Sequence, residues 1–378
     1  YMASMWDSLE SVWMAYKDDP NHDVYVIAIP YYEKNKDGSL GKMHNEGDLY
    51  PDYVPITSWD EYSIVESHPD IIYIHNPYDG HNFVTSVHPE YYAKNLRNHT
   101  DMLVYIPYFV SYEELPKHLC ILPGTIYADK VIVQSNEHRQ IYINEFHSYE
   151  QENNCHGLFG KIEDKFISLG LPKFDKVINT GKKDVIIPKE WLNLIQKPDG
   201  EYKRIVLYNT TIESLLNNSD VIIAKIKSVL EEFKKETEVT LLWRPHPLNK
   251  TTLSSMRPQL IKQYQEIIQT YKNENWGIYD DTADLNRAIA ISDAYYGDWS
   301  SVVALFELTG KPIMIQVPDI LNNSYNILKS FNIDMERRAI FNDYIEDEDY
   351  VWFWTMTVNA LYQVDKKSGE VKRLSEFI

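Results

Sequence analysis

A guanidinium and an imidazole follow the same short apolar run in this chain. The run covers residues 239–243, and Arg244 and His246 come after it, each followed by a proline. A short apolar run between polar residues is typical of a buried strand in a parallel sheet, and proline keeps the residue before it out of the helical conformation. Ligands of open α/β sheets bind beyond the carboxyl ends of the strands. The pattern therefore predicts an anion site, with phosphate as the first choice, or alternatively a rigid loop with a surface histidine.

Two further polar segments occur where a predicted strand turns into a predicted helix. The first is Gly-Asp-Trp-Ser-Ser at 297–301, and the second is Asn-Thr-Thr at 209–211. Unpaired N–H groups and the helix dipole favour an anion at such a turn, and the hydroxyl groups add hydrogen-bond donors. The structural alternative for both segments is a simple serine or threonine N-cap.

The elements that must position these residues alternate between strands and helices along the whole chain. This pattern predicts an α/β protein with two Rossmann-like, doubly wound domains that face a central cleft. We place the N-terminal domain at residues 1–180, a linker at 181–200, the C-terminal domain at 201–345 and a helical tail at 346–378. The chain opens on a helix that leads into a strand, so we expect the first strand of the N-terminal domain to lie upstream of Tyr1.

The amino-acid composition excludes several classes of binding partner. The 378 residues carry a formal net charge of −19, which argues against general binding of nucleic acid or of an anionic membrane. Two cysteines provide neither a disulfide framework nor a metal cluster and indicate a reducing cytoplasm. Asp280 and Asp281 are expected in a solvated turn and not at a metal. No apolar run is long enough for a transmembrane helix, so any association with the inner membrane face would be peripheral.

Taken together, the ordered segments resemble one family, the CDP-glycerol glycerophosphotransferases of teichoic-acid and capsule synthesis, which have a GT-B type fold. The resemblance covers roughly residues 125–316. The segments that carry it are Ala-Asp-Lys-Val-Ile-Val-Gln-Ser at 128–135, Gly-Leu-Pro-Lys-Phe-Asp at 170–175, Leu-Tyr-Asn-Thr-Thr at 207–211, Arg-Pro-His-Pro at 244–247, Ser-Asp-Ala-Tyr-Tyr-Gly-Asp-Trp-Ser-Ser-Val at 292–302 and Gly-Lys-Pro-Ile at 310–313.

The resemblance implies transfer of glycerol phosphate, or a related polyol phosphate, from a CDP-linked donor to an acceptor hydroxyl, with release of CMP. It implies no tightly bound cofactor, and it makes CDP-glycerol the expected donor and a glycan or polyol phosphate the expected acceptor. Arg244 and His246 would bind the donor pyrophosphate, and Asp298 would shape its turn. The other residues expected around the donor are Gly170, Lys173, Asn209, Thr210, Thr211, Gly297, Ser300 and Ser301.

The chain departs from the family pattern at the base that would activate the acceptor. Polymerases of the family carry a Trp-His-Gly-Thr segment in the first domain, whereas the matching strand end here reads Tyr-Ile-Pro-Tyr-Phe at 105–109. His75 follows the preceding predicted strand, where an imidazole with a pKa near neutrality could act as a general base, and Asp79 lies close to it. We name His75, with His246 and Asp79, as the catalytic candidates. Weaker ones are His81, His88 and His118.

Two other functions fit the same residues. One is a GT-B sugar transferase that uses a nucleotide sugar, with Glu307 gripping the ribose. The other is a catalytically silent domain that binds nucleotide or polymer, which the missing first-domain histidine favours. Two measurements distinguish the three functions: which nucleotide stabilises the protein, and which nucleotide the protein consumes.

Overall fold

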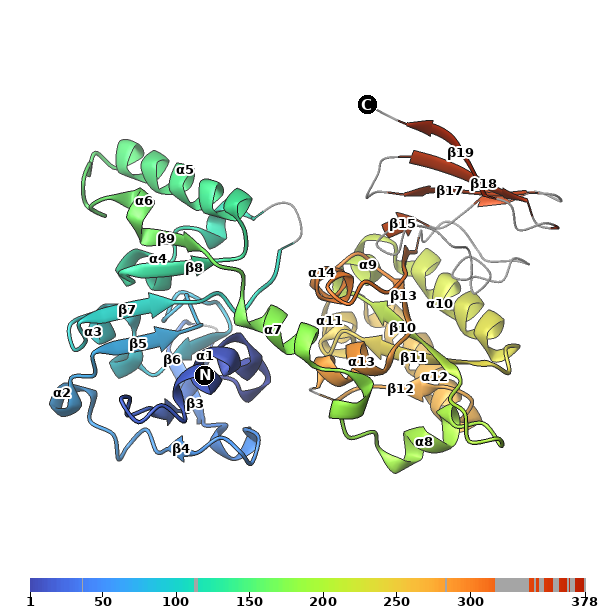
Figure 1. Cartoon of the computed structure of the whole chain (residues 1–378), viewed down its shortest axis with the longest axis horizontal. Coiled ribbons are helices and arrows are strands. Elements are labelled where there is room, and N and C mark those ends of the chain that lie inside the picture. Colours follow the sequence, from blue (N-terminus) through green and yellow to red (C-terminus); the bar gives the residue numbers. More distant parts are fainter. Residues whose placement is uncertain are drawn as a thin grey trace. The chain divides into compact units, whose positions relative to one another are not determined.

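The computed structural model describes residues 1–35, 37–111, 115–282 and 284–316, and beyond them 340–342, 345–346, 350–355, 360–365, 367 and 371–376. The chain forms two compact units, Tyr1–Lys176 and Val177–Ile378, shown in Figure 1. The boundary falls inside helix α7 (Pro172–Asn179), close to the predicted domain end at residue 180. Each unit is an α/β unit with a parallel sheet, so the predicted fold class is confirmed.

The second unit has the strand order of a dinucleotide-binding fold. Strands β12, β11, β10, β13, β14 and β15 lie side by side in that order, and all of them are parallel. If these six strands are numbered 1 to 6 in chain order, their order in the sheet is 3-2-1-4-5-6. The chain first adds strands on one side of β10 and then on the other side, so the direction of winding reverses between β10 and β13. The bounds are β10 Arg204–Thr210, β11 Val239–Pro245, β12 Ile278–Tyr279, β13 Ala294–Gly297, β14 Ile313–Ile315 and β15 Ile340–Asn342.

Helices cover both faces of this sheet, as Figure 1 shows. Alternate strand residues such as Tyr208 and Trp243 are fully buried in one apolar cluster with helices α10 and α12. Full burial of a large side chain contributes about 1.5–3 kcal/mol, so this layer is a main source of stability. On the other face, Tyr295 packs against Phe306 of α14. The helices are α8 Lys189–Ile195, α9 Ile212–Asn217, α10 Ser219–Lys234, α11 Asn249–Met256, α12 Pro258–Glu274, α13 Leu285–Ile291 and α14 Ser301–Glu307, with the 3-10 turn η5 at Lys182–Asp184.

Two of the predicted segments have a different structure. The predicted linker at 181–200 contains α8, whose Trp191 and Ile195 are buried, so the segment is part of the second unit. The prediction of a helical tail is wrong where the structure describes it. Strands β17, β18 and β19 pair antiparallel there and extend the sheet beyond β15. Their bounds are β17 Tyr350–Thr355, β18 Ala360–Asp365 and β19 Val371–Glu376, with the short β16 at Ile345–Glu346.

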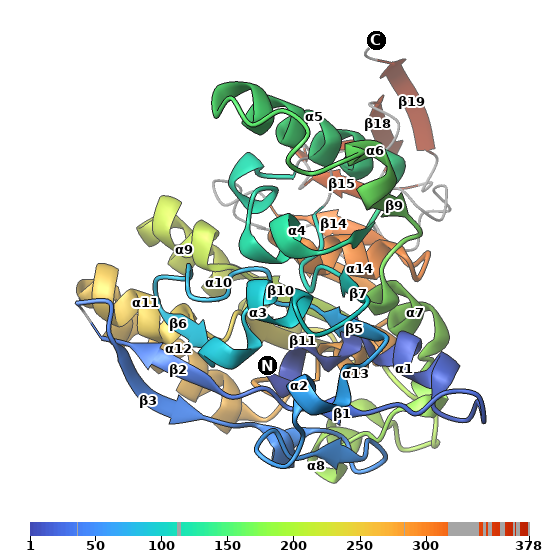
Figure 2. The ribbon, with the colours of Figure 1, turned by 90° about the vertical axis from the view of Figure 1, so that its left-hand side faces the viewer.

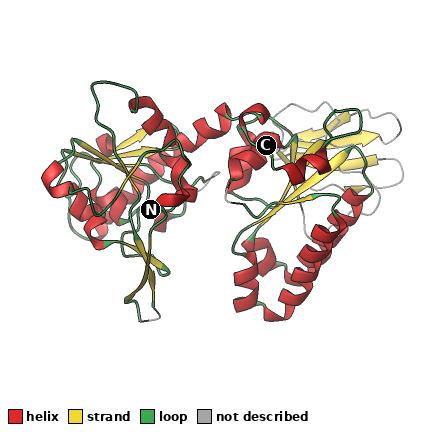
Figure 3. Cartoon of the chain, turned by 90° about the horizontal axis from the view of Figure 1, so that it is seen from below, coloured by secondary structure: helices red, strands yellow, loops and turns green. Residues whose placement is uncertain are grey.

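The first unit is built on the parallel sheet β5-β7-β8-β9, whose strands follow one another in chain order. A separate sheet, β3-β2-β6, extends away from its body in Figures 2 and 3, and β1 pairs with β4. Strand bounds are β1 Val26–Ile27, β2 Tyr31–Lys34, β3 Leu40–His44, β4 Ile56–Thr57, β5 Ile71–Ile74, β6 Thr85–Val87, β7 Met102–Tyr105, β8 Lys130–Val133 and β9 Phe166–Ser168. The helical elements are η1 Ala3–Ser8, α1 Glu10–Tyr16, η2 Gly47–Leu49, α2 Ile64–Ser67, η3 Pro89–Tyr91, α3 Ala93–Arg97, η4 Lys117–Leu119, α4 Pro123–Tyr127, α5 Asn136–Glu152 and α6 Ile162–Lys165.

Helix α7 is tied to the N-terminal helical segment by side chains. Lys173 pairs with Asp7 of η1, and both side chains are largely buried. Lys176 pairs with Glu10 of α1 at 3.0 Å. The segment η1–α1 is therefore anchored on the helix that carries the boundary between the units.

Candidate functional site

Three of the predicted donor residues lie side by side at the carboxyl edge of the second unit. Asn209 on β10 is in register with Arg244 on β11 and with Gly297 on β13. The Asn209 side-chain amide donates to the Arg244 main-chain carbonyl at 2.8 Å, and the Asn209 main-chain carbonyl accepts from the Asp298 N–H at 3.0 Å. Gly297 has φ 147°, and a Cβ there would collide with the Asn209 backbone. The residues thus meet where the strand order reverses, which is the usual ligand position in this fold.

Asp298 holds this turn together. One carboxylate oxygen accepts from the Thr211 N–H at 2.6 Å and from the Thr211 hydroxyl at 3.1 Å, and the other accepts from the Gln316 amide. Burial raises the pKa of Asp298 above its usual value, and these hydrogen bonds oppose the shift. Asp298 therefore connects the ends of β10, β13 and β14. Gln316 was not identified from the sequence, because it is 18 residues away and follows an ordinary apolar strand.

Several predicted phosphate-binding hydroxyls already have partners inside the protein. Thr211 caps α9 by accepting from the Ser214 N–H at 3.2 Å. Ser300 caps α14 by accepting from the Val302 N–H and donates to the Asn209 side chain, both at 3.2 Å. Thr210 is fully buried and accepts from the Trp243 indole at 3.2 Å. The N-cap alternative thus describes Thr211 and Ser300, whereas the Ser301 side chain is exposed.

Arg244 forms a buried ion pair, and binding of pyrophosphate by its guanidinium stays a prediction. Its Nη1 donates to the carboxylate of Asp280, and its Nη2 donates to the Thr282 carbonyl at 2.8 Å. Asp280 is fully buried and Arg244 is 9% exposed. Asp280 was expected in a solvated turn, and that prediction is wrong because the aspartate compensates the arginine charge. Only Asp281 is exposed as expected.

His246 is exposed just beyond β11, and its ring is oriented by the backbone. Its main-chain N–H donates to the Thr210 carbonyl at 2.9 Å, and its Nδ1 accepts from the Leu248 N–H at 3.2 Å. Desolvation lowers the pKa of His246, which favours the neutral ring. Because Nδ1 is the acceptor, the proton of the neutral ring lies on Nε2. His246 therefore offers a hydrogen-bond donor at the switch point and not a base.

His75 lies at the carboxyl end of β5 in the first unit and is 5% exposed. Its Nδ1 contacts the Ser8 hydroxyl at 2.8 Å. Its Nε2 is buried and has no hydrogen-bond partner among the described residues. Burial holds the pKa of His75 well below its usual value; the charges of the Tyr1 ammonium and of Lys173 add to the shift, and a hydrogen bond to the Met5 backbone opposes it. A neutral imidazole with an unsatisfied buried nitrogen requires an explanation, and a catalytic role is one.

Two of the other first-unit candidates, Asp79 and His88, have structural roles. Both carboxylate oxygens of Asp79 accept from the Ala93 N–H at 2.9 Å, so Asp79 caps α3. Burial raises the pKa of Asp79 to about 7. The His88 ring accepts from the Glu90 N–H at 3.4 Å at the start of η3. Among the residues that the structure describes, no side-chain hydrogen bond or ion pair of His81 or His118 is found.

Gly170 and Lys173 belong to the first unit, whereas the other predicted donor residues belong to the second. Gly170 has φ 83° and forms the turn before α7. The Lys173 ammonium is paired with Asp7 and is only 13% exposed. The contact of Lys173 with the donor stays a prediction, and the ion pair with Asp7 also anchors η1.

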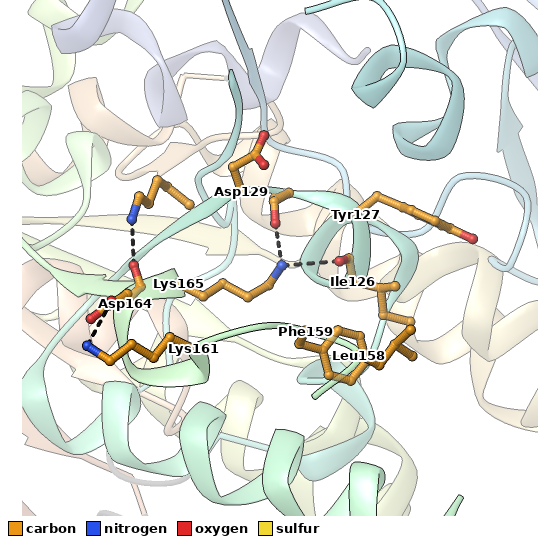
Figure 4. A pocket seen from close by; sticks show the side chains of 10 residues that line it. Ile126, Tyr127, Asp129, Leu158, Phe159, Lys161, Asp164 and Lys165 are labelled. Atoms are coloured by element: carbon orange, nitrogen blue, oxygen red, sulfur yellow. Dashed lines mark hydrogen bonds and ion pairs between the residues drawn. The ribbon is translucent and has the colours of Figure 1, made fainter. Parts of the chain in front are cut away.

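A pocket of about 330 Å³ lies at the opposite edge of the first-unit sheet, where β8 and β9 begin (Figure 4). Its buried Lys165 donates to the main-chain carbonyls of Ile126 and Ala128, and burial lowers its pKa to about 8. Lys161 pairs with Asp164 at 3.3 Å on the pocket rim. Parallel sheets bind ligands at the carboxyl edge, and the Lys165 ammonium of this pocket already donates to main-chain carbonyls, so we do not assign the reaction to it.

Neither a metal nor a membrane span is found in the described part of the chain. No group of three or more His, Cys, Asp and Glu side chains could hold a metal ion among the described residues. Within the same residues, no helix is both long and apolar enough to cross a bilayer.

The chain matches the family described as CDP-glycerol:poly(glycerophosphate) glycerophosphotransferase over residues 127–369, which is about two thirds of its length. The chain belongs to this family. The match contains the whole switch point of this glycerophosphotransferase family member, including His246 and Ser301. It does not reach His75 or Ser8, so their roles rest on the structure alone. A comparison with curated protein sequences returned no match.

Among solved structures, this family member is similar to the wall teichoic acid polymerase TagF. One TagF structure is 16% identical with a TM-score of 0.35, and covers 57% of this chain and 48% of the TagF chain. A TagF variant soaked with CDPG is 16% identical with a TM-score of 0.43, and covers 83% and 66%. A UDP-N-acetylglucosamine 2-epimerase is 11% identical with a TM-score of 0.45, and covers 88% and 78%. The chain thus spans about half to two thirds of these polymerase chains.

Proposed function

We propose that this protein transfers glycerol phosphate, or a related polyol phosphate, from a CDP-linked donor to an acceptor hydroxyl during synthesis of a teichoic acid or capsule polymer. The family match over residues 127–369 carries this proposal. The sheet order of the second unit supports it, because the matched polar segments meet where the winding reverses between β10 and β13. Phosphoryl transfer needs positioning and charge stabilisation, which polar groups fixed by a rigid sheet can supply.

His246 and Ser301 are the side chains that we assign to the donor phosphates. Both are exposed at the switch point, unlike the paired Arg244 and Asp298. The His246 Nε2–H follows from the bond between Nδ1 and the Leu248 N–H, and it can donate to a phosphate oxygen. A hydrogen bond to a charged group contributes about 1.5–3 kcal/mol.

His75 is the side chain that we assign to the acceptor hydroxyl. Its low pKa keeps the ring neutral, and its buried Nε2 lacks a partner among the described residues. A general base accelerates a reaction by about 10²–10⁴-fold. His75→Ala should therefore reduce kcat by about this factor while the affinity for the donor is unchanged. Unchanged turnover would remove His75 from the reaction.

A donor panel tests the proposed function. The protein is incubated with CDP-glycerol, CDP-ribitol and UDP-sugars, and both thermal stabilisation and release of CMP or UDP are measured. We expect stabilisation by the CDP compounds, and release of CMP when a polyol-phosphate acceptor is added. Stabilisation by UDP-sugars alone would instead favour a sugar transferase. Binding of a CDP compound without turnover on any acceptor would favour a silent binding domain.

The assignment of His246 has its own test. His246→Ala should raise the Kd for CDP-glycerol by about tenfold to a hundredfold. The control is His156→Ala, which removes an exposed imidazole from the first unit and should leave the Kd unchanged. Equal affinities of the two variants would contradict the assignment.

We place the reaction in the cytoplasm, with peripheral association at the inner membrane face where a polymer acceptor would be presented. The two cysteines are free thiols, which fits a reducing compartment. Fractionation of cells that express the tagged protein tests this location: recovery of the protein outside the cytoplasmic membrane would contradict it.

A further inference from the structure

Ser8 and His75 form a buried pair that connects two distant parts of the first unit. Ser8 ends η1 and is fully buried, and His75 follows β5, 67 residues later in the chain. The Ser8 oxygen lies 2.8 Å from His75 Nδ1 and 2.5 Å from the Met5 carbonyl oxygen. A buried polar contact of this kind fixes the orientation of the ring.

The direction of these hydrogen bonds follows from the chemistry of the three groups. A carbonyl oxygen can only accept, so the single hydroxyl proton of Ser8 is donated to Met5. The Ser8 oxygen must then accept in its contact with His75, which requires a proton on Nδ1. We propose that Ser8 is a positioning residue that holds His75 as the Nδ1–H tautomer, with Nε2 unprotonated and ready to accept a proton.

The surroundings of His75 support this assignment. The rings of Tyr1 and Tyr108 approach it edge-on, with centroids at 6.5 Å and 6.4 Å. The Lys173 ammonium disfavours a second positive charge nearby, and it is itself compensated by Asp7. The ring is thus kept neutral, and Nε2 has no hydrogen-bond donor among the described side chains. A hydroxyl of the acceptor would satisfy this nitrogen.

The inference rests on the proposed function, since it takes His75 as the proton acceptor. In the step, the acceptor oxygen forms a bond to the phosphorus that carries the glycerol. The bond from that phosphorus to the bridging pyrophosphate oxygen breaks, and CMP leaves with the electron pair. The acceptor proton moves to Nε2, and the resulting imidazolium keeps its Nδ1–H bond to Ser8 before it releases a proton to solvent.

The tautomer can be measured without any assay of activity. Protein labelled with ¹⁵N-histidine is studied by long-range ¹H–¹⁵N correlation, and the His75 signals are identified by their loss in His75→Gln. We expect a protonated Nδ1 and an unprotonated Nε2 in the wild type at pH 7. An Nε2–H tautomer in the wild type would overturn the proposal, and so would an unchanged Nδ1–H signal in Ser8→Ala.

Kinetics test the consequence for turnover. Ser8→Ala should lower kcat by about tenfold without changing KM for the donor, because one hydrogen bond that orients the base is lost. Ser8→Thr keeps the hydroxyl and should restore both kcat and the Nδ1–H signal. The matched control is Ser11→Ala, which removes a hydroxyl that bonds Asp175 at 2.7 Å in the same N-terminal segment. An equal loss of kcat in Ser11→Ala would overturn the proposal.

The two measurements separate the failure of the inference from the failure of the proposed function. A wild-type protein that shows the Nδ1–H tautomer but releases no CMP from any CDP donor would refute the function and leave the tautomer assigned. Turnover that depends on His75 but is the same in Ser8→Ala would refute the positioning role alone.

Discussion

Replacing Arg244 by methionine should destabilise the second unit, although the residue lies at the edge of the sheet where ligands bind. Its guanidinium is paired with the fully buried carboxylate of Asp280. Removing one partner of a buried ion pair leaves an uncompensated charge and costs about 3–5 kcal/mol. In a unit of this size each kcal/mol shifts the unfolding temperature by roughly 2–4 °C, so we expect a fall of roughly 6–20 °C.

Thermal unfolding followed by circular dichroism measures this fall in Arg244→Met, in Asp280→Asn and in the double variant. The double variant leaves neither charge unpaired, so it should recover part of the stability that each single variant loses. The matched control is Asp281→Asn, whose exposed carboxylate pairs with Lys272 at 3.1 Å. Exposed pairs contribute about 0–1 kcal/mol, so the control should unfold close to the wild-type temperature.

Binding of CDP-glycerol to the same proteins, measured well below their unfolding temperatures, completes the test. We expect the affinity of folded Arg244→Met to change little, because the guanidinium is engaged by Asp280 and Thr282. An Arg244→Met protein that unfolds at the wild-type temperature but no longer binds the donor would refute this reasoning. It would return Arg244 to the pyrophosphate site that the sequence pattern predicted.

Three further predictions follow from conformation and protonation. Because burial holds the pKa of His75 well below its usual 6.5, the acid limb of kcat/KM should lie below pH 6.5, and a midpoint above that value would contradict the assignment. The Asp79 pKa is raised from 3.8 to about 7, so the folded state binds this proton more tightly and stability should fall as the pH rises through this interval. Asp79→Asn keeps an acceptor for the start of α3 and should remove that decline in thermal scans, whereas a persisting decline would argue against Asp79 as its source. Gly297→Ala should cost about 1–3 kcal/mol or more, because a Cβ collides with the Asn209 backbone. Gly310→Ala, with φ 67° and open space for a Cβ, should lose less stability, and equal losses would contradict the clash.

The central strands could be predicted from the sequence because each is marked by neighbouring residues alone, namely a short apolar run followed by a polar turn. The apolar run that ends in Arg-Pro-His-Pro is a buried strand throughout, and β10 and β13 also lie where short apolar runs precede polar turns. The aromatic run at 352–354 was assigned to a helix but lies in strand β17. A short apolar run has no period that separates a buried strand from a helix, so neighbouring strands decide its conformation.

The side-chain partners at the site could not be predicted, because they depend on the packing of distant segments. Arg244 was expected to face an anionic ligand, but the fold brings Asp280 to it from beyond β12. His75 was identified from its place at a strand end, and its partner Ser8 was not, because η1 reaches it only in the folded unit. The sequence pattern indicates which side chains are chemically able to bind or react. It does not indicate which of these side chains already have a hydrogen-bond or ion-pair partner inside the folded protein.

The short turn η1 couples two parts of the first unit mechanically. Its neighbouring residues Asp7 and Ser8 hold Lys173 of α7 and the ring of His75, respectively. The same short turn therefore supplies both the hydrogen bond that orients the His75 ring and the ion pair that anchors the helix in which the boundary between the two units falls.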